Sequence, residues 1–188
     1  SSRARIIVYN KGLIKEGQIK SYEDLADPKY KGQICARSSS HPYMLSLIAS
    51  IVAHSGEQKA EAWVKGLKEN LARDPKGGDT DQIKAAAAGE CAHAITNQYY
   101  FVRLLRSGKA EDKSITEKLG YLFPNQDGRG AHINISGGGM LAHAPHKDAA
   151  RAFLEYLATD EAQAYFANGN NEWPAVASVK LNNPALQS

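Results

Sequence analysis

Apolar positions follow two different periods along the chain, which predicts strands as well as helices. The apolar run Ile6-Ile7-Val8 lies at the centre of residues 3–10. Because it is short and rich in β-branched residues, it favours a buried strand. Further extended segments are predicted at residues 33–37, 91–96, 120–124 and 131–136, with an extended run resuming at 140–142.

Helical spacing of apolar residues predicts helices between these strands. A short helix begins at Ser21 with Asp24 three residues on, and another begins at Pro42, where proline suits the first helical position. Ser55 with Gln58 resembles a capping box, as does Asp79 with Gln82.

The second half of the chain continues this alternation. Asn97 is expected to cap a helix, whereas residues 109–118 form a polar segment to which no element is assigned. Two closing helices are predicted at 147–157 and 159–167. The first should turn Ala150, Phe153 and Leu154 inward, and Thr159 should cap the second. Strands alternating with helices predict an α/β fold with a mostly parallel sheet.

Composition is that of an ordinary globular protein. The chain has 188 residues, of which 43% are hydrophobic and 23% charged. A formal charge of +3, with acids and bases mixed, does not indicate a nucleic-acid surface. No stretch is apolar over the roughly 20 residues that a membrane helix needs.

The two cysteines, Cys35 and Cys91, leave two interpretations open. An oxidising compartment would join them in one disulfide, whereas two buried thiols in two strands explain the pair equally well. Neither residue belongs to a CxxC motif, which makes redox chemistry or structural zinc a poor interpretation.

Two loops carry the candidate chemistry, because each follows a buried strand and opens a helix. Residues 37–43 contain Ser39, Ser40 and Tyr43, and residues 96–100 end in Tyr99 and Tyr100. In an open α/β sheet, such loops meet beyond the carboxyl ends of the strands.

When two tyrosines are adjacent on a helix, one ring ordinarily packs in the core and the other lies on the surface. This is the simplest interpretation of Tyr99 and Tyr100. Arg103 favours another, since it lies three and four residues further along the predicted helix, within reach of both phenols. A nearby cation is expected to lower a phenol pKa and to favour phenolate, a hard oxygen donor for a trivalent cation.

Other motifs are weaker. None of the six histidines stands at zinc-binding spacing, and His93 is expected to be a satisfied core residue. Gly137-Gly138-Gly139 lacks the spacing of a phosphate-binding loop.

Considered together, these segments resemble the ferric-ion-binding periplasmic proteins of the Fbp/Fut/Idi type, which are cluster-II solute-binding proteins of ABC importers. The resemblance rests on the two tyrosine loops and covers nearly the whole chain. Further matching segments are residues 3–10, 24–32, 71–84, 88–91 and 149–174, the last containing Glu172-Trp173-Pro174.

The resemblance implies a site and a role. Tyr43, Tyr99 and Tyr100 match the family's iron ligands, and Arg103 matches the arginine that supports their charge or a synergistic anion such as carbonate. Ser39 and Ser40 are further candidates for anion contacts. The implied function is binding of Fe³⁺ in the periplasm and delivery to an inner-membrane ABC permease, without catalysis.

The resemblance also implies a periplasmic-binding-protein-like lobe of type II. Relatives begin with a further stretch of about a hundred residues, the size of a small domain. Residues 1–122 would then form the tyrosine-bearing lobe, 123–171 would cross to the missing lobe, and 172–188 would return. The missing lobe or a second copy is expected to complete the site.

Three other functions remain open at this point. A solute-binding protein of the same fold would hold an anion or a small organic cation against the tyrosines. An enzyme would use Tyr99 or Tyr100 as a general acid or base, although no partner stands at motif spacing. A truncated lobe would retain little binding, and its uncovered face would favour dimerisation.

Overall fold

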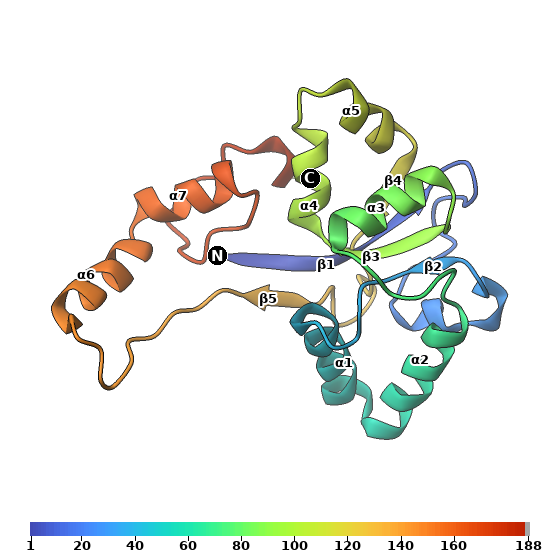
Figure 1. The fold of residues 1–188 in the computed structure, drawn as a ribbon, viewed down its shortest axis with the longest axis horizontal. Helices are drawn as coiled ribbons and strands as arrows, with labels where there is room; N and C mark the ends of the chain where they lie inside the picture. Colours follow the sequence, from blue (N-terminus) through green and yellow to red (C-terminus); the bar gives the residue numbers. More distant parts are fainter. Residues whose placement is uncertain (187–188) are drawn as a thin grey trace. The chain divides into compact units, whose positions relative to one another are not determined.

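The computed structural model describes residues 1–186, which fall into two units. One unit is Ala4–His132, and the other joins Ser1–Arg3 to the segment that begins at Ile133 (Figure 1). Through residue 132 the elements are β1 (Ser2–Asn10), η1 (Glu23–Ala26), η2 (Pro28–Tyr30), β2 (Ile34–Cys35), α1 (Pro42–Ser55), α2 (Glu57–Glu69), α3 (Asp79–Ala88), β3 (His93–Asn97), α4 (Gln98–Leu105), α5 (Ala110–Glu117) and β4 (Leu119–Leu122). They are followed by β5 (Ile133–Ile135), α6 (Lys147–Leu157), α7 (Asp160–Gly169) and η3 (Pro184–Leu186).

The α/β class is confirmed, but the sheet is mixed rather than mostly parallel. Strands follow the order β2-β3-β1-β4, and β5 pairs with β1 off this path. β2 and β3 are parallel, whereas β1 runs antiparallel to both β3 and β4. Neither of those neighbours follows β1 directly in the chain. The local pattern therefore contains no information about the direction of β1.

Helices cover both faces of this sheet in the larger unit, with α1 and α2 on one side and α3 and α4 on the other (Figure 1). Successive strand residues point to opposite faces. Ile7 and Ile95 accordingly pack with α1 and α2, while Ile6 and Val8 pack with α3 and α4. All four side chains are fully buried.

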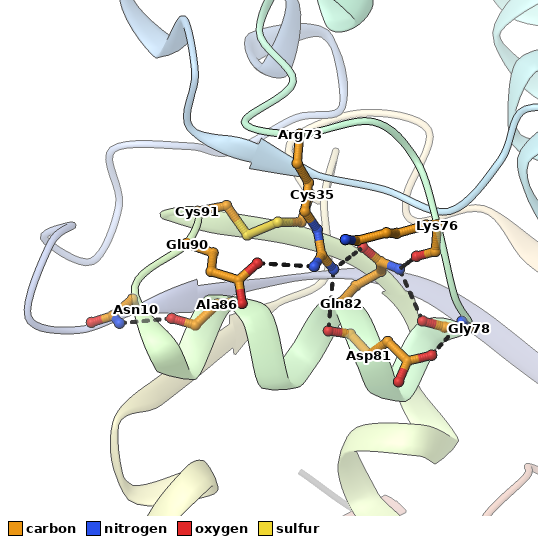
Figure 2. Close-up of a disulfide and its surroundings, with 10 residues drawn as sticks. All are labelled: Asn10, Cys35, Arg73, Lys76, Gly78, Asp81, Gln82, Ala86, Glu90 and Cys91. Atoms are coloured by element: carbon orange, nitrogen blue, oxygen red, sulfur yellow. Dashed lines mark hydrogen bonds and ion pairs between the residues drawn. A yellow bond between two sulfur atoms is a disulfide. The ribbon is translucent and has the colours of Figure 1, made fainter.

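Cys35 and Cys91 form a disulfide that ties β2 to the residues preceding β3 (Figure 2). The bridge lies beside α3, and next to it the Arg73 guanidinium donates to Glu90 at 2.9 Å. The cross-link therefore holds together the two strands from which the tyrosine loops emerge.

Two predicted helix caps are wrong. Ser55 is the last residue of α1, and Gly56, with a positive φ of 84°, takes the cap position of α2. Gly78 takes the cap position of α3, and the Asp81 carboxylate accepts its backbone N–H at 2.7 Å. The Asp79 side chain therefore does not cap α3, and its carboxylate accepts from Arg5 instead.

Other differences lie in polar or weakly patterned segments. Residues 110–117 form α5, although 109–118 was predicted only as a polar segment, and 140–142 contains no strand. The prediction for α7 is confirmed at its cap, where the Thr159 hydroxyl accepts the Ala162 N–H.

α6 has the predicted bounds but not the predicted burial. None of its residues is buried in the described part of the chain, and Phe153 is 59% exposed. An amphipathic pattern specifies which side of a helix is apolar and does not specify what covers it. The proposed division at residues 122 and 171 concerns a further lobe and stays a prediction.

None of the helices in residues 1–186 combines the length and apolarity that a membrane crossing requires.

Candidate metal centre

Tyr43 stands in the first turn of α1, directly after the loop that leaves β2. His41 precedes the helix and its Nδ1 accepts the Tyr43 backbone N–H at 3.2 Å. Pro42 occupies the first helical position, where its missing N–H leaves no bond unmade. The local sequence therefore determines where α1 begins and places Tyr43 in its first turn.

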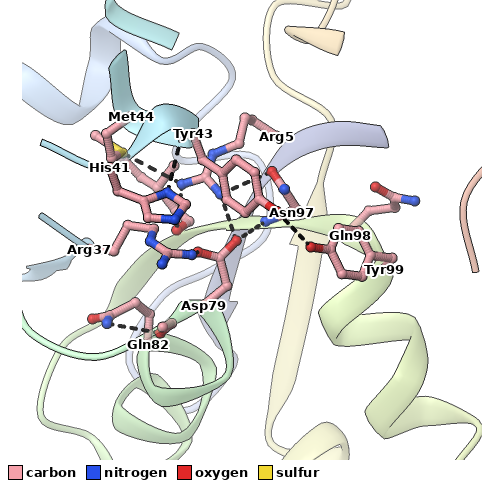
Figure 3. Close-up of polar contacts among 12 residues, drawn as sticks. Arg5, Arg37, His41, Tyr43, Met44, Asp79, Gln82, Asn97, Gln98 and Tyr99 are labelled. Carbon is pink, nitrogen blue, oxygen red and sulfur yellow. Dashed lines mark hydrogen bonds and ion pairs between the residues drawn. The ribbon is translucent and has the colours of Figure 1, made fainter. Parts of the chain in front are cut away.

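Tyr99 and Tyr100 stand in the first turn of α4, which follows β3 without an intervening loop. Tyr99 is 7% exposed and Tyr100 is half-buried, and their rings stack with centroids 4.2 Å apart. The Tyr99 hydroxyl lies 3.1 Å from the Tyr43 hydroxyl (Figure 3). The structure therefore brings together the three tyrosines, and it does not divide the adjacent pair between core and surface.

Arg103 reaches both rings of the pair, as expected from its spacing. Its guanidinium carbon lies 5.7 Å from the centroid of Tyr99 and 5.5 Å from that of Tyr100. The expected lowering of the phenol pKa is wrong for Tyr99. Burial, followed by hydrogen bonding to Tyr100 and Tyr43, raises the pKa of Tyr99 well above its ordinary value. Without metal, this phenol is therefore protonated at neutral pH.

A buried ion cluster behind Tyr43 was not predicted. Arg5 and Asp79 are both 0% exposed, and Arg5 Nη1 donates to Asp79 Oδ2 at 2.6 Å. Arg37 Nη1 donates to the other carboxylate oxygen at 3.1 Å (Figure 3). The sequence feature that could have predicted this cluster is Arg5, because a charged residue in an apolar strand requires a buried partner.

Comparison with known proteins identifies the family of the chain. The family model for bacterial extracellular solute-binding proteins matches residues 2–188. The chain belongs to this family.

Several of the proteins that this chain is similar to are named for iron. The chain is 47% identical over 182 residues to iron uptake protein A1 of Synechocystis, covering 97% of this chain and 51% of that protein. A Trichodesmium IdiA (FutA) structure in complex with iron and citrate is 52% identical, with a TM-score of 0.89 over 96% of this chain and 57% of that one. The ferric binding protein of Campylobacter jejuni is 44% identical, with a TM-score of 0.94 over 100% of this chain and 59% of that one. The chain thus spans about half the length of the curated relatives it matches.

The serine candidates of this solute-binding protein lie on the loop before α1. Ser39 and Ser40 are exposed, and Ser40 Oγ lies 2.8 Å from Ser38 Oγ. Ser39 also lines a mainly apolar cavity of about 430 Å³, together with Arg37 and Met44 but with none of the three tyrosines. Anion binding by the two serines stays a prediction.

No group of three or more His, Cys, Asp or Glu side chains is arranged to hold a metal within residues 1–186. His93 is buried as expected, but its interpretation as a satisfied residue is wrong. Neither ring nitrogen has a hydrogen-bond partner in the described part of the chain.

Proposed function

We propose that this chain binds ferric iron through the phenolate oxygens of Tyr43, Tyr99 and Tyr100. The observation that carries the proposal is the 3.1 Å separation of the Tyr43 and Tyr99 hydroxyl oxygens, with Tyr100 stacked on Tyr99. Oxygen ligands lie about 2 Å from a small hard cation, so two of them at right angles are about 3 Å apart. The 3.1 Å spacing suits two ligands of one ion.

Phenolate chemistry also suits Fe³⁺. Metal ligands bind in their deprotonated form, so the ion must displace the proton of Tyr99. Arg103 then lies against both rings and offsets part of the negative charge of the phenolates.

Three phenolates leave coordination positions for other oxygen donors. The Trichodesmium relative was solved with iron and citrate. We propose that a small oxygen anion such as carbonate or citrate occupies part of the remaining positions, with Arg103, Ser39 and Ser40 as candidate contacts. We propose that residues outside this chain, in a further lobe or in a second copy, supply the other ligands.

The biological role follows from the family. Solute-binding proteins of this type present their cargo to importers, and we propose delivery of iron to an ABC permease of the inner membrane. The periplasm is the corresponding location, and the Cys35–Cys91 disulfide suits its oxidising conditions. Binding and release of cargo require no catalytic step.

The test is a visible absorption titration of the 188-residue chain with ferric citrate. We expect a broad iron–phenolate band that is lost in the double variant Tyr99→Phe/Tyr100→Phe. Tyr165→Phe is the matched control, because this tyrosine is 71% exposed and lies in the other unit. A wild-type chain that remains colourless, or a band that survives the double substitution, would contradict iron ligation by these tyrosines. A colourless chain that retains an organic solute would favour the other class of cargo.

A further inference from the structure

One carboxylate, Asp79, contacts both of the segments that precede the tyrosine-bearing helices α1 and α4. Its Oδ1 accepts from Arg37, which precedes the Tyr43 loop, at 3.1 Å. Its Oδ2 accepts the backbone N–H of Asn97, which immediately precedes α4, at 2.6 Å. Figure 3 shows the carboxylate between these two partners, with the Tyr43 ring above it and Tyr99 on the far side of Asn97.

Arg5 completes the connection from the centre of the sheet. Besides Asp79, it donates to the Asn97 side-chain oxygen at 3.0 Å and to the Ile95 carbonyl at 3.2 Å. Its guanidinium carbon lies 5.8 Å from the Tyr43 ring centroid, and that of Arg37 lies 5.2 Å from it. The Tyr43 ring therefore rests against two cations that are both bonded to Asp79.

Stability alone is a weak reason for such a cluster. Removing two charges from water is costly, and well-packed apolar residues in place of a buried ion pair are often as stable. A carboxylate with directed bonds to two loops does what apolar packing cannot, because each bond fixes a distance and an angle. The distance fixed here separates the loop of Tyr43 from the start of α4.

We propose that Asp79 and Arg37 are positioning residues for iron binding, which hold the Tyr43 hydroxyl within ligand distance of the Tyr99 hydroxyl. The inference rests on the proposed function. Neither residue is a ligand in this scheme. Arg37 acts through Tyr43, and Asp79 acts through Arg37 on one side and Asn97 on the other.

The variant Arg37→Gln breaks the link to the Tyr43 loop and leaves the buried Arg5–Asp79 pair in place. We expect its iron affinity to fall by about 10- to 100-fold, the usual effect of removing a partner that orients a metal ligand. The visible absorption per bound iron of Arg37→Gln should fall to the value of Tyr43→Phe, because both variants lose the Tyr43 phenolate as a ligand. The double variant Arg37→Gln/Tyr43→Phe should show no greater loss of absorption per bound iron than Tyr43→Phe alone. Asp79→Asn should show the same change of the absorption band. If Asp79→Asn does not fold, Arg37→Gln alone tests the inference.

Asn70→Ala is the control for general destabilisation. Asn70 is 1% exposed in the same unit, and its side-chain amide donates to the Leu25 and Asp27 carbonyls, away from the tyrosines. We expect it to lower the unfolding midpoint while keeping the wild-type band and iron affinity. The inference is overturned if Arg37→Gln keeps the wild-type band while Tyr43→Phe loses it, or if Asn70→Ala changes the band as Arg37→Gln does. A wild-type chain without any band would instead overturn the proposed function, and this inference with it.

Discussion

His93 makes the stability of this protein depend on pH in a way that one substitution can isolate. The imidazole is 0% exposed and lies edge-on against the Tyr30 ring, with centroids 5.3 Å apart. Beside it is a cavity of only about 10 Å³, lined mainly by apolar residues. Burial in these surroundings lowers the pKa of His93 to about 4, from an ordinary value of 6.5.

The sign and size of the effect follow from this difference. Between pH 6.5 and pH 4 the unfolded chain binds a proton at His93 that the folded chain does not, so folding stability falls as the pH falls. One pKa unit corresponds to 1.36 kcal/mol, so lowering the pKa of His93 from 6.5 to about 4 costs about 3 kcal/mol of folding stability by pH 4. Above pH 6.5 both states are neutral at this residue, and its full contribution to stability is present.

The assay compares urea unfolding of the wild type with that of His93→Phe at a series of pH values. Phenylalanine keeps an aromatic ring against Tyr30 but does not titrate. Carboxylates elsewhere titrate equally in both proteins, so the difference between the two free energies of unfolding isolates His93. We expect wild type to lose about 3 kcal/mol relative to the variant between pH 7 and pH 4. Parallel curves over that range would refute the reasoning and would show that His93 is protonated or hydrogen-bonded in the folded protein.

Three further predictions concern other parts of the chain. Replacing Cys35 and Cys91 by serine opens a loop with a sequence separation of 56 residues, and the chain-entropy model predicts a loss of about 4 kcal/mol in urea unfolding. Gly66→Ala in α2 places a Cβ 2.7 Å from the Ala26 carbonyl oxygen, and we expect a destabilisation of about 1–3 kcal/mol despite alanine's higher helix propensity. Because the pKa of Tyr99 is raised, iron binding should release its proton, and iron affinity should increase with pH.

Each of these has a direct control. Reduction of the wild type with a thiol should reproduce the cysteine result, and an unchanged unfolding midpoint would contradict it. Gly108→Ala adds a Cβ with no atom within 4 Å and should be close to neutral. Calorimetric iron titrations in buffers of different ionisation enthalpy count the protons released. Identical heats in all buffers would exclude release from Tyr99.

Much of the local structure was predictable because short-range patterns govern it. Residues 147–157 form a helix with the predicted bounds, and Pro42 begins α1 where proline at a first helical position suggests. The three tyrosines were identified from residue type, position after a strand and family resemblance. For the helices, residues within about one or two helical turns carry the information.

Properties that depend on distant residues were not predictable. The direction of β1 depends on strands that do not follow it in the chain. Asp79 had the pattern of a helix cap, yet its carboxylate accepts from Arg5, 74 residues away, because the strand charge needs a buried counter-ion. Phe153 was predicted to face inward from an apolar helix pattern, yet its side chain is 59% exposed.

The sequence by itself therefore determined the α/β class and most helix and strand positions, and it supplied the tyrosines that we propose as metal ligands. Only the tertiary structure decided that the Tyr43 and Tyr99 hydroxyls lie 3.1 Å apart, that burial raises the pKa of Tyr99, and that Asp79 joins the segments preceding their helices. The physical reason is the separation along the chain over which each interaction acts. Backbone preferences and side-chain periodicity act between neighbours in the chain, whereas desolvation and ion pairing depend on which distant segments the fold brings together.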